Sequence, residues 1–237
     1  MSARRIVVLT AGLSTPSTTR MLGDQLARAA RDALGARGDQ VQIHTVELRE
    51  MAHELTDALL TRVPGENLAA VIEQIRAADA VIAVSPIFNT GASALFKMFF
   101  DAVDVELWQG RTVLLGATAG SARHSLALEY ALRPMFVYLK AQVVPTAVFA
   151  ASEDFGGIGE ESRSLADRAR CAGEELAELV VGRTVSSTTG SADARREDGD
   201  GNDSHGEDTA AERSARGRGL DAEFSDFTPM DQLLGRG

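Results

Sequence analysis

Cysteine is almost absent from this chain, which has Cys171 alone among 237 residues. A single cysteine cannot form an internal disulfide, so a small secreted scaffold held together by disulfides is excluded. Its neighbours on a predicted helix are alanines and Leu176, and we therefore expect a buried thiol. Long apolar runs are also missing near the N-terminus, where Ile6 to Leu9 is far shorter than a signal-peptide core or the ~20 residues of a membrane span. These scarcities predict a soluble, cytoplasmic protein without a membrane partner.

Basic charge is the next scarcity. The chain carries 24 Lys and Arg against 34 Asp and Glu, a net charge of −10. A nucleic-acid-binding surface needs clustered Lys and Arg to contact phosphates, so we expect no nucleic-acid partner. No group of His, Cys and Asp residues has the spacing of metal ligands, and we expect no metal.

The length predicts one domain with an appendage. We expect a folded domain over residues 1–183 and a disordered acidic linker over 184–219, whose only large aliphatic residue is Val185. Such a stretch buries too little apolar surface to offset the entropy cost of ordering its backbone. Apolar residues return in 220–237, which either docks on a surface or is a frayed terminus. They are Leu220, Phe224, Phe227, Met230, Leu233 and Leu234.

Within the predicted domain, five short apolar runs alternate with segments of helical periodicity. This alternation predicts an α/β fold in which a doubly wound parallel sheet has helices on both faces. The last run contains Pro145, which is typical of an edge strand. The predicted strands are 6–9, 41–46, 80–84, 113–117 and 143–149, and the predicted helices are 21–34, 54–78 with a break near Pro64, 92–103, 124–139 and 160–181.

In such a sheet, ligands bind beyond the carboxyl ends of the strands. The first of these turns, residues 10–20, has one glycine, whereas a dinucleotide-binding loop needs three. It has five hydroxyls just before a helix, where backbone N–H groups and the helix dipole favour a phosphate. An ordinary helix cap would need one hydroxyl. The candidate phosphate-binding side chains are Ser14, Thr15, Ser17, Thr18 and Thr19, with Arg20 as either a cationic contact or a solvated helix residue.

Two further turns carry candidate binding residues. After the third strand, Pro86 turns the chain away from the sheet, and Asn89 and Thr90 lie in a turn that is able to present polar groups to a flat heteroaromatic ring. Phe88 either flanks such a ring or packs in the core. After the fourth strand, Thr118 to Ser121 includes Gly120, which lets a planar ligand approach the backbone. His124 follows, as a ligand contact or a helix cap.

The three turns together resemble one family. The hydroxyl-rich segment 14–20, Ser-Pro-Ile-Phe-Asn-Thr-Gly at 85–91 followed by Ala-Leu-Phe-Lys at 94–97, and Thr-Ala-Gly-Ser-Ala-Arg-His-Ser from 118 followed by Leu-Glu-Tyr-Ala-Leu-Arg-Pro at 128–134 are similar to motifs of the NAD(P)H-dependent FMN reductases. The likeness covers about residues 4–182. It is closest to the flavin-supplying components of two-component monooxygenases, including the sulfonate-utilisation reductases.

The resemblance implies a flavodoxin-like fold with strand order 2-1-3-4-5 and FMN bound across the strand ends. It implies that Ser14, Ser17, Thr18 and Thr19 hold the phosphate. Pro86, Ile87, Phe88, Asn89 and Thr90 would line the isoalloxazine, and Thr118, Ala119, Gly120 and Ser121 would border it on the other side. Two positions depart from the family pattern: Leu13 follows Gly12 where the family has Gly-Ser, and Phe88 stands where it often has Tyr.

The resemblance also implies the reaction, in which NADPH or NADH gives a hydride to flavin N5 without an obligatory protein acid or base. We therefore name no catalytic side chain. Arg123 and Arg20 are candidates for recognising NADPH. A homodimer or homotetramer is expected through helices 92–103 and 124–139, with Tyr130 and Trp108 as core or interface aromatics, and a luciferase-like flavin monooxygenase is the expected partner.

Two other functions remain open at this point. One is a reductase that uses bound FMN to reduce quinones, azo dyes or metal oxyanions. The other is a flavodoxin-type electron carrier, which usually clamps its flavin between large aromatic side chains. With aromatics at 5% of the chain, only Phe88 and Trp108 are available for that role.

Overall fold

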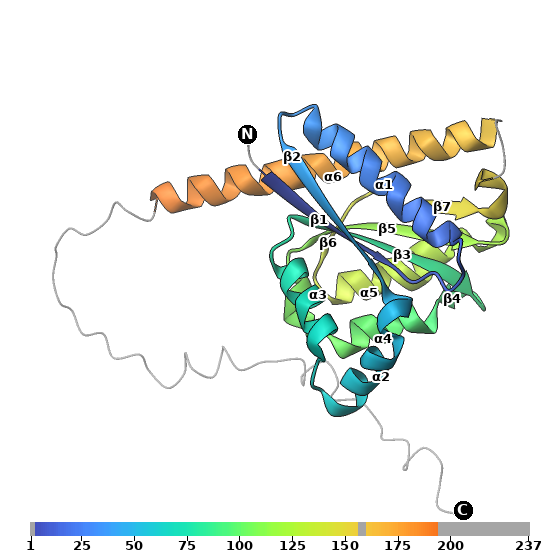
Figure 1. Cartoon of the computed structure of the whole chain (residues 1–237). Coiled ribbons are helices and arrows are strands. Elements are labelled where there is room, and N and C mark those ends of the chain that lie inside the picture. Colours follow the sequence, from blue (N-terminus) through green and yellow to red (C-terminus); the bar gives the residue numbers. More distant parts are fainter. Residues whose placement is uncertain (1–2, 156–159, 194–237) are drawn as a thin grey trace, which may run out of the picture. The chain divides into compact units, whose positions relative to one another are not determined.

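The computed structural model describes residues 3–155 and 160–193. In this part of the chain a twisted parallel sheet lies between two layers of helices (Figure 1). The strand order is β2-β1-β3-β5-β6, with β7 also paired to β5 and the short β4 paired to β3. The strands are β1 (Ala3–Thr10), β2 (Gln40–Glu47), β3 (Ala80–Phe88), β4 (Gly91–Ala92), β5 (Thr112–Ala119), β6 (Gln142–Val143) and β7 (Val148–Ala151).

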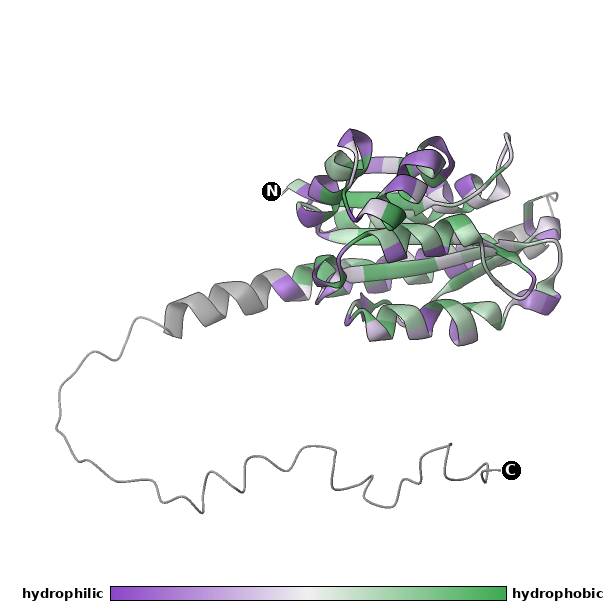
Figure 2. Ribbon diagram, turned by 90° about the horizontal axis from the view of Figure 1, so that it is seen from below, coloured by the Kyte–Doolittle hydropathy of each residue, from purple (hydrophilic) through white to green (hydrophobic). Residues whose placement is uncertain are grey.

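The three central strands are the apolar runs of the sequence. Ile82 of β3 lies between Val8 of β1 and Leu114 of β5 in the parallel register, and all three side chains are fully buried. Figure 2 shows the hydrophobic residues concentrated along these strands and the helix faces that cover them. The predicted order 2-1-3-4-5 is confirmed once the two-residue β4 is set aside and β6 and β7 are taken as two pieces of the fifth strand.

Helices cover both faces of the sheet, as the alternating pattern predicts. Helices α1 and α6 bury Leu22, Leu26 and Leu176 on one face, while α2 to α5 cover the other face with side chains such as Phe96 and Phe136 (Figure 1). The helices are α1 (Thr18–Gly35), α2 (Ala52–Thr61), α3 (Glu66–Arg76), α4 (Ala94–Ala102), α5 (Arg133–Tyr138) and α6 (Glu160–Asp193).

Helices α1 and α6 approach each other at the level of their backbones. A Cβ atom added to Gly173 of α6 would lie 2.7 Å from the carbonyl carbon of Ala29 in α1. No side chain fits at that separation, so Gly173 is required for this helix crossing. Cys171, two residues earlier, is exposed, and the expectation of a buried thiol is wrong.

Five of the aromatic residues gather in one cluster. Trp108, in the 3-10 turn η2 (Val105–Trp108), has its ring centroid 4.7 Å from that of Phe100 in α4, and Phe100 lies 4.9 Å from Phe136 in α5. Trp108 is fully buried, so it belongs to the core, whereas Tyr130 is 79% exposed. The cluster joins α4 to α5 beneath the sheet, and its members are Phe96, Phe99, Phe100, Trp108 and Phe136.

The predicted helix 124–139 is wrong in its first half. The structure has a 3-10 turn, η3 (Ala122–His124), then a π-helical turn, η4 (Leu128–Leu132), and α-helix only from Arg133. Pro134 has no N–H to donate to the carbonyl four residues earlier, and its ring crowds that carbonyl, so a continuous α-helix cannot pass through this point. The backbone widens into a π turn instead.

The structure describes the first ten residues beyond the predicted domain boundary at residue 183. Helix α6 continues to Asp193, so the backbone is helical over 184–193, the first part of the expected linker. The rest of that linker and the segment 220–237 lie outside the described residues and stay predictions. Among the helices that the structure describes, none is both long enough and apolar enough to cross a bilayer.

Candidate functional site

A cavity of about 400 Å³ lies at the carboxyl ends of β1, β3 and β5. It is formed by the three turns that the sequence singles out, because parallel strands bring the turns that follow them to one edge of the sheet. The predicted site residues that line it are Ser14, Ser17, Thr18, Thr19, Pro86, Ile87, Phe88, Thr118, Ala119 and Gly120.

The loop between β1 and α1 is folded tightly against the start of the helix. Ser17 is the N-cap of α1, and its hydroxyl accepts a hydrogen bond from the Arg20 backbone N–H at 3.2 Å. A Cβ atom on Gly12 would lie 2.0 Å from Ser17 Oγ, so a side chain at this position would displace the Ser17 hydroxyl. The amides of Thr18 and Thr19 have no acceptor within the helix, as in the first turn of any helix, and the turn contains no acidic residue. The loop therefore offers donors without a competing carboxylate.

Thr19 also connects two of the turns. Its Oγ1 lies 2.8 Å from Thr118 Oγ1 at the end of β5, and both side chains are buried. The shared hydrogen bond uses one hydroxyl proton, which leaves the other free to donate elsewhere. This pair fixes the spacing between the loop after β1 and the loop after β5.

The turn after β3 is a two-residue hairpin. Phe88 pairs with Gly91, and the residues between them, Asn89 and Thr90, have φ angles of 49° and 69°. Asparagine tolerates this left-handed region, but a β-branched threonine does so at a cost of order 1–3 kcal/mol. Such strain concentrates at functional sites, and here it lies beside the cavity.

Two serines hold this hairpin in place. Ser85 is fully buried, and its Oγ donates to the Pro86 carbonyl at 2.9 Å and accepts from the Ser93 backbone N–H at 3.0 Å. Ser93 in turn caps α4 by accepting from the Phe96 N–H at 3.2 Å. These bonds bind both ends of the hairpin to the sheet and to α4, and the cavity wall at Phe88 is thereby rigid at its base.

Arg20 points away from the cavity. Its guanidinium pairs with Asp24 at 2.9 Å and with Glu47, at the end of β2, at 2.7 Å. The hydrogen bond that Arg20 donates to Asp24 raises the pKa of Arg20 above its ordinary value. Arg49 also pairs with Glu47, at 2.9 Å, and donates to the Ser14 carbonyl at 3.2 Å and to the Thr15 hydroxyl. Arg49 is therefore the basic residue that contacts the loop, and sequence reasoning missed it because it follows a strand without a glycine or hydroxyl signal.

The remaining predicted residues do not line this cavity. Ser121 and Asn89 flank it in sequence, and Thr90 and His124 line a neighbouring cavity of about 310 Å³. Three lining residues were not predicted: Gly12, Leu13 and Ser152. Ser152 directly follows β7, so the rule that leads to the other turns also applies to the end of the fifth strand.

The arrangement fits a phosphate joined to a flat ring. Hydroxyls and amides gather at the N-terminus of α1, where the helix dipole favours an anion. Pro86, Phe88, Ala119 and Gly120 present mostly apolar surface on the other side, and Phe88 is 46% exposed. In the described part of the chain, no group of three His, Cys, Asp or Glu residues is arranged to hold a metal ion.

A parallel sheet in this order, with a hydroxyl-rich loop before α1 and a cavity at the strand ends, defines the class of flavodoxin-like proteins. The sequence model of the NADPH-dependent FMN reductases matches residues 4–156. The chain belongs to this family of oxidoreductases, which uses NAD(P)H and FMN.

Individual relatives agree with this assignment. The chain is 31% identical to an NADPH-dependent FMN reductase of Pseudomonas aeruginosa over 180 residues, which are 76% of this chain and 94% of that protein. It is 32% identical to the NADH-dependent FMN reductase SfnF of Pseudomonas putida over 154 residues, 65% of this chain and 81% of that protein. The structure of an oxidoreductase from Corynebacterium diphtheriae is 43% identical, with a TM-score of 0.74 over 77% of this chain and 99% of that one.

Proposed function

We propose that this protein reduces FMN with NAD(P)H in the cavity at the carboxyl ends of β1, β3 and β5. The observation that carries the proposal is the convergence of a phosphate-type donor set and a group of apolar side chains and glycine in one cavity. Bound FMN supplies the hydride-accepting atom, N5 of its ring. The chain's own residues bind and orient the two cofactors, and no side chain is required as an acid or base.

Each turn has a separate part in this proposal. Ser17, Thr18 and Thr19 donate hydrogen bonds to the FMN phosphate, with the positive charge of Arg49 behind their loop. Ser14, whose hydroxyl donates to the Pro16 carbonyl at 2.9 Å, contributes its backbone N–H. Pro86, Ile87 and Phe88 form one side of the ring site, with Asn89 and Thr90 following at its edge, and Thr118, Ala119 and Gly120 form the other side, followed by Ser121. The hydrogen bond between Thr19 and Thr118 keeps the phosphate end and the ring end at a fixed separation.

The phosphate assignment is tested by removing one hydroxyl. Ser17→Gly deletes a donor while keeping a residue that caps helices almost as well as serine, so the fold should change little. Because a hydrogen bond to a charged group contributes about 1.5–3 kcal/mol, the Kd for FMN should rise at least about tenfold. Riboflavin, which has no phosphate, should bind as before.

Calorimetric titration of both flavins measures this difference, with Thr56→Ala on α2 as a control for loss of an exposed hydroxyl. Equal weakening of FMN and riboflavin would place the phosphate elsewhere.

A steady-state assay separates this function from its alternatives. NAD(P)H oxidation that rises with added free FMN supports the proposal, whereas oxidation that needs a quinone or azo dye in place of free FMN supports a reductase with bound flavin. A carrier would oxidise neither nucleotide. The carrier is already disfavoured by Trp108, which lies fully buried in the aromatic cluster and so cannot clamp a ring.

We further propose that the reduced FMN serves a flavin-dependent monooxygenase of the luciferase-like kind, and that the protein works in the cytoplasm. The exposed thiol of Cys171 suits a reducing compartment. The partner is tested by coupling the purified protein to such a monooxygenase at limiting flavin. Product formation that depends on both proteins supports the proposal, and product formation with chemically reduced FMN alone at the same rate contradicts a role for direct delivery.

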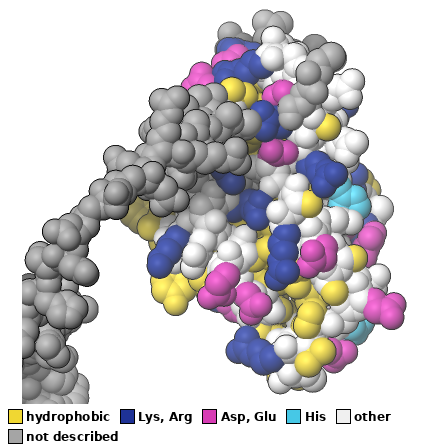
Figure 3. All heavy atoms as spheres, turned by 90° about the vertical axis from the view of Figure 1, so that its left-hand side faces the viewer, with side chains coloured by type: hydrophobic (Ala, Val, Ile, Leu, Met, Phe, Trp, Pro, Cys, Tyr) yellow, Lys and Arg dark blue, Asp and Glu magenta, His cyan; other side chains and the backbone are white. Residues whose placement is uncertain are grey.

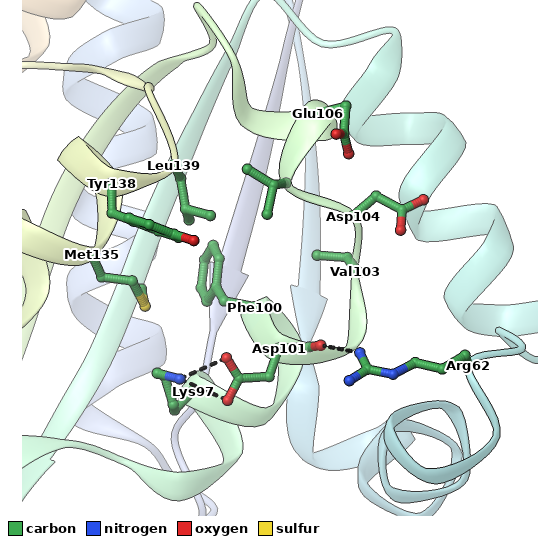
Figure 4. A pocket seen from close by; sticks show the side chains of 11 residues that line it. Arg62, Lys97, Phe100, Asp101, Val103, Asp104, Glu106, Met135, Tyr138 and Leu139 are labelled. Atoms are coloured by element: carbon green, nitrogen blue, oxygen red, sulfur yellow. Dashed lines mark hydrogen bonds and ion pairs between the residues drawn. The ribbon is translucent and has the colours of Figure 1, made fainter. Parts of the chain in front are cut away.

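We also propose that the face formed by α4 and α5 joins two copies of the chain. A cavity of about 540 Å³ lies there, and Figure 4 shows Tyr138 and Met135 from α5 pointing toward Phe100 of α4, beside the ion pair between Lys97 and Asp101. Tyr138 is 77% exposed, and Val137 is 63% exposed. Exposed apolar side chains beside a hollow are typical of an interface.

Light scattering after size-exclusion chromatography tests this face. Tyr138→Glu should lower the mass of the particle, because it places a charge in an apolar contact. Met21→Glu, a similar change on α1 and so on the other side of the sheet, should leave the mass unchanged. A single-chain mass for the unaltered protein would refute the proposal.

A further inference from the structure

A second cavity is lined by the two segments that also line the proposed flavin site. It has a volume of about 310 Å³ and is bounded by the hairpin turn at Thr90 and by the segment from Arg123 to Ala131. The same two segments, slightly earlier in sequence, form the walls of the flavin cavity at Phe88 and Gly120. A molecule that reaches across the flavin would therefore enter this second cavity.

The lining of the second cavity is basic and contains no carboxylate. Arg123 and His124 lie on its wall, and the other lining side chains are uncharged. Among the described residues, no hydrogen bond or ion pair engages the Arg123 guanidinium. The other arginines near the site are committed: Arg20 and Arg49 to Glu47, and Arg133 to Glu129. An exposed, uncommitted guanidinium beside a cavity is suited to bidentate recognition of a phosphate.

An aromatic ring stands at the same cavity. Tyr130, in the π turn η4, is 79% exposed, and Leu126 beside it is 64% exposed. Base rings stack on exposed aromatic side chains with little sequence or base preference. One cavity thus offers a flat apolar surface and a phosphate-binding cation, which together match an adenosine that carries a phosphate.

We propose that this cavity binds the adenosine end of the nicotinamide dinucleotide and that Arg123 recognises the 2′-phosphate, so that Arg123 sets a preference for NADPH over NADH. This inference rests on the proposed FMN reduction but concerns a different part of the site. His124 is a second donor to the same phosphate, and Tyr130 stacks on the adenine. Relatives of this chain include both NADPH- and NADH-dependent reductases, so the preference has to be encoded in individual residues.

The test uses the full chain and the variant Arg123→Gln. Adenosine 2′,5′-bisphosphate and 5′-AMP differ by the 2′-phosphate alone, and calorimetry measures the binding of each. The unaltered protein should bind the bisphosphate at least about tenfold more tightly, the effect of one charged hydrogen bond, and the variant should lose most of this preference and keep only the part that His124 supplies. In the FMN assay, the variant should raise KM for NADPH by a similar factor and leave KM for NADH unchanged.

Two further variants make the result decisive. Arg31→Gln, which removes an exposed arginine from α1, should leave the binding of both NADPH and NADH unchanged. Tyr130→Leu should weaken the binding of NADPH and of NADH to the same extent. Equal weakening of NADPH and NADH by Arg123→Gln would assign Arg123 to the diphosphate and overturn the proposal, as would a change in oligomeric mass without a change in nucleotide preference. Activity with NADH in every variant keeps this outcome distinct from a failure of the proposed FMN reduction.

Discussion

Gly12 controls the shape of the loop between β1 and α1 because it has no side chain. In Gly12→Ala the new Cβ would lie 2.0 Å from Ser17 Oγ, so the serine has to leave its capping position. We expect the Kd for FMN to rise at least about tenfold, since the loop loses both its shape and a donor. Calorimetric titration with FMN measures the change.

Gly35→Ala is the matched control for this substitution. Gly35 ends α1, and a Cβ atom there meets no other atom within 4 Å. The affinity of Gly35→Ala for FMN should match that of the unaltered protein. If Gly12→Ala also binds FMN normally, the loop adapts to a side chain, and its tight turn is not needed for phosphate binding.

The residues that the sequence could and could not predict differ in the range of their interactions. Ser17 and Thr19 are predictable because a cluster of hydroxyls between a strand and a helix by itself indicates a helix cap or a phosphate site. The bond from Thr19 to Thr118 spans 99 positions in the chain and depends on the packing of β5 beside α1. Arg20 shows the same limit: its charge is visible in the sequence, but its pairing with Glu47 is set by the position of β2.

At the scale of elements, the π turn η4 is held by a single arginine. Arg133 pairs with Glu129 and donates to the carbonyls of Val144 and Pro145, at 3.2 and 2.9 Å. The carbonyls belong to the break between β6 and β7, where Pro145 cannot donate a ladder hydrogen bond. The break and the π turn therefore stabilise each other across the edge of the sheet.

This pairing predicts a small acid dependence. The hydrogen bond from Arg133 lowers the pKa of Glu129 below its ordinary value. A carboxyl with a lowered pKa stabilises the fold above its unfolded-state pKa, and the stabilisation is lost as pH falls through the folded-state value. Since the Glu129 side chain is 49% exposed, the effect should be a few tenths of a kcal/mol.

Urea unfolding at pH 6 and at pH 3 measures the contribution of Glu129 to the free energy of unfolding. Glu129→Gln should be slightly less stable than the unaltered protein at pH 6 and equal to it at pH 3. The matched control, Glu73→Gln, alters an ion pair with Arg76 that is exposed on both sides and should show no such convergence. A constant difference between Glu129→Gln and the unaltered protein at both pH values would contradict the prediction.

The elements differ in how well the sequence predicts them. The central strands are predicted from continuous apolar runs, because a strand that helices cover on both faces has apolar side chains on both faces. The fifth strand was predicted as one piece, yet it is interrupted where Glu175 of α6 accepts hydrogen bonds from the Thr146 backbone and hydroxyl, both at 2.7 Å. The interruption depends on a contact with a residue 29 positions later in the chain. The local periodicity of the sequence carries no information about such a contact.

At the scale of the whole molecule, α6 supplies the last buried core residues of the described part of the chain. Val180 is the last buried hydrophobic residue of the described part, and Arg183 reaches back to Thr112 at the start of β5. Truncation after Asp193 retains every one of these contacts. We expect an unchanged melting temperature within about 2 °C and unchanged reduction of free FMN, because the removed residues contribute no described core contact.

A shorter truncation is the control. Ending the chain after Ala172 removes Leu176, Ala177 and Val180 from the core against α1 and should lower the melting temperature strongly or prevent folding. If truncation after Asp193 also destabilises the protein, residues beyond 193 complete the core. If it leaves stability unchanged but slows a coupled monooxygenase assay, the removed segment acts on the partner.

Charge is distributed unevenly along the sequence. Figure 3 shows one face on which basic and acidic side chains are interspersed, with no extended field of one sign. Residues 1–183 carry a net charge of −4, against −6 for 184–237. At the proposed sites, attraction of the anionic FMN and NADPH is therefore expected to depend on local groups such as Arg49 and Arg123.

The burial of Trp108 gives the molecule a built-in spectroscopic label for one of its two layers. It is the only tryptophan in the chain, and it lies against Phe100 and Phe136 on the α4–α5 side of the sheet. Its emission therefore reports whether that layer is packed, while the layer of α1 and α6 contributes no indole signal. A stopped-flow unfolding trace followed by tryptophan emission would time the loss of the α4–α5 packing alone. Far-ultraviolet circular dichroism would follow both layers, so any lag between the two signals measures how independently the two sides of the sheet come apart.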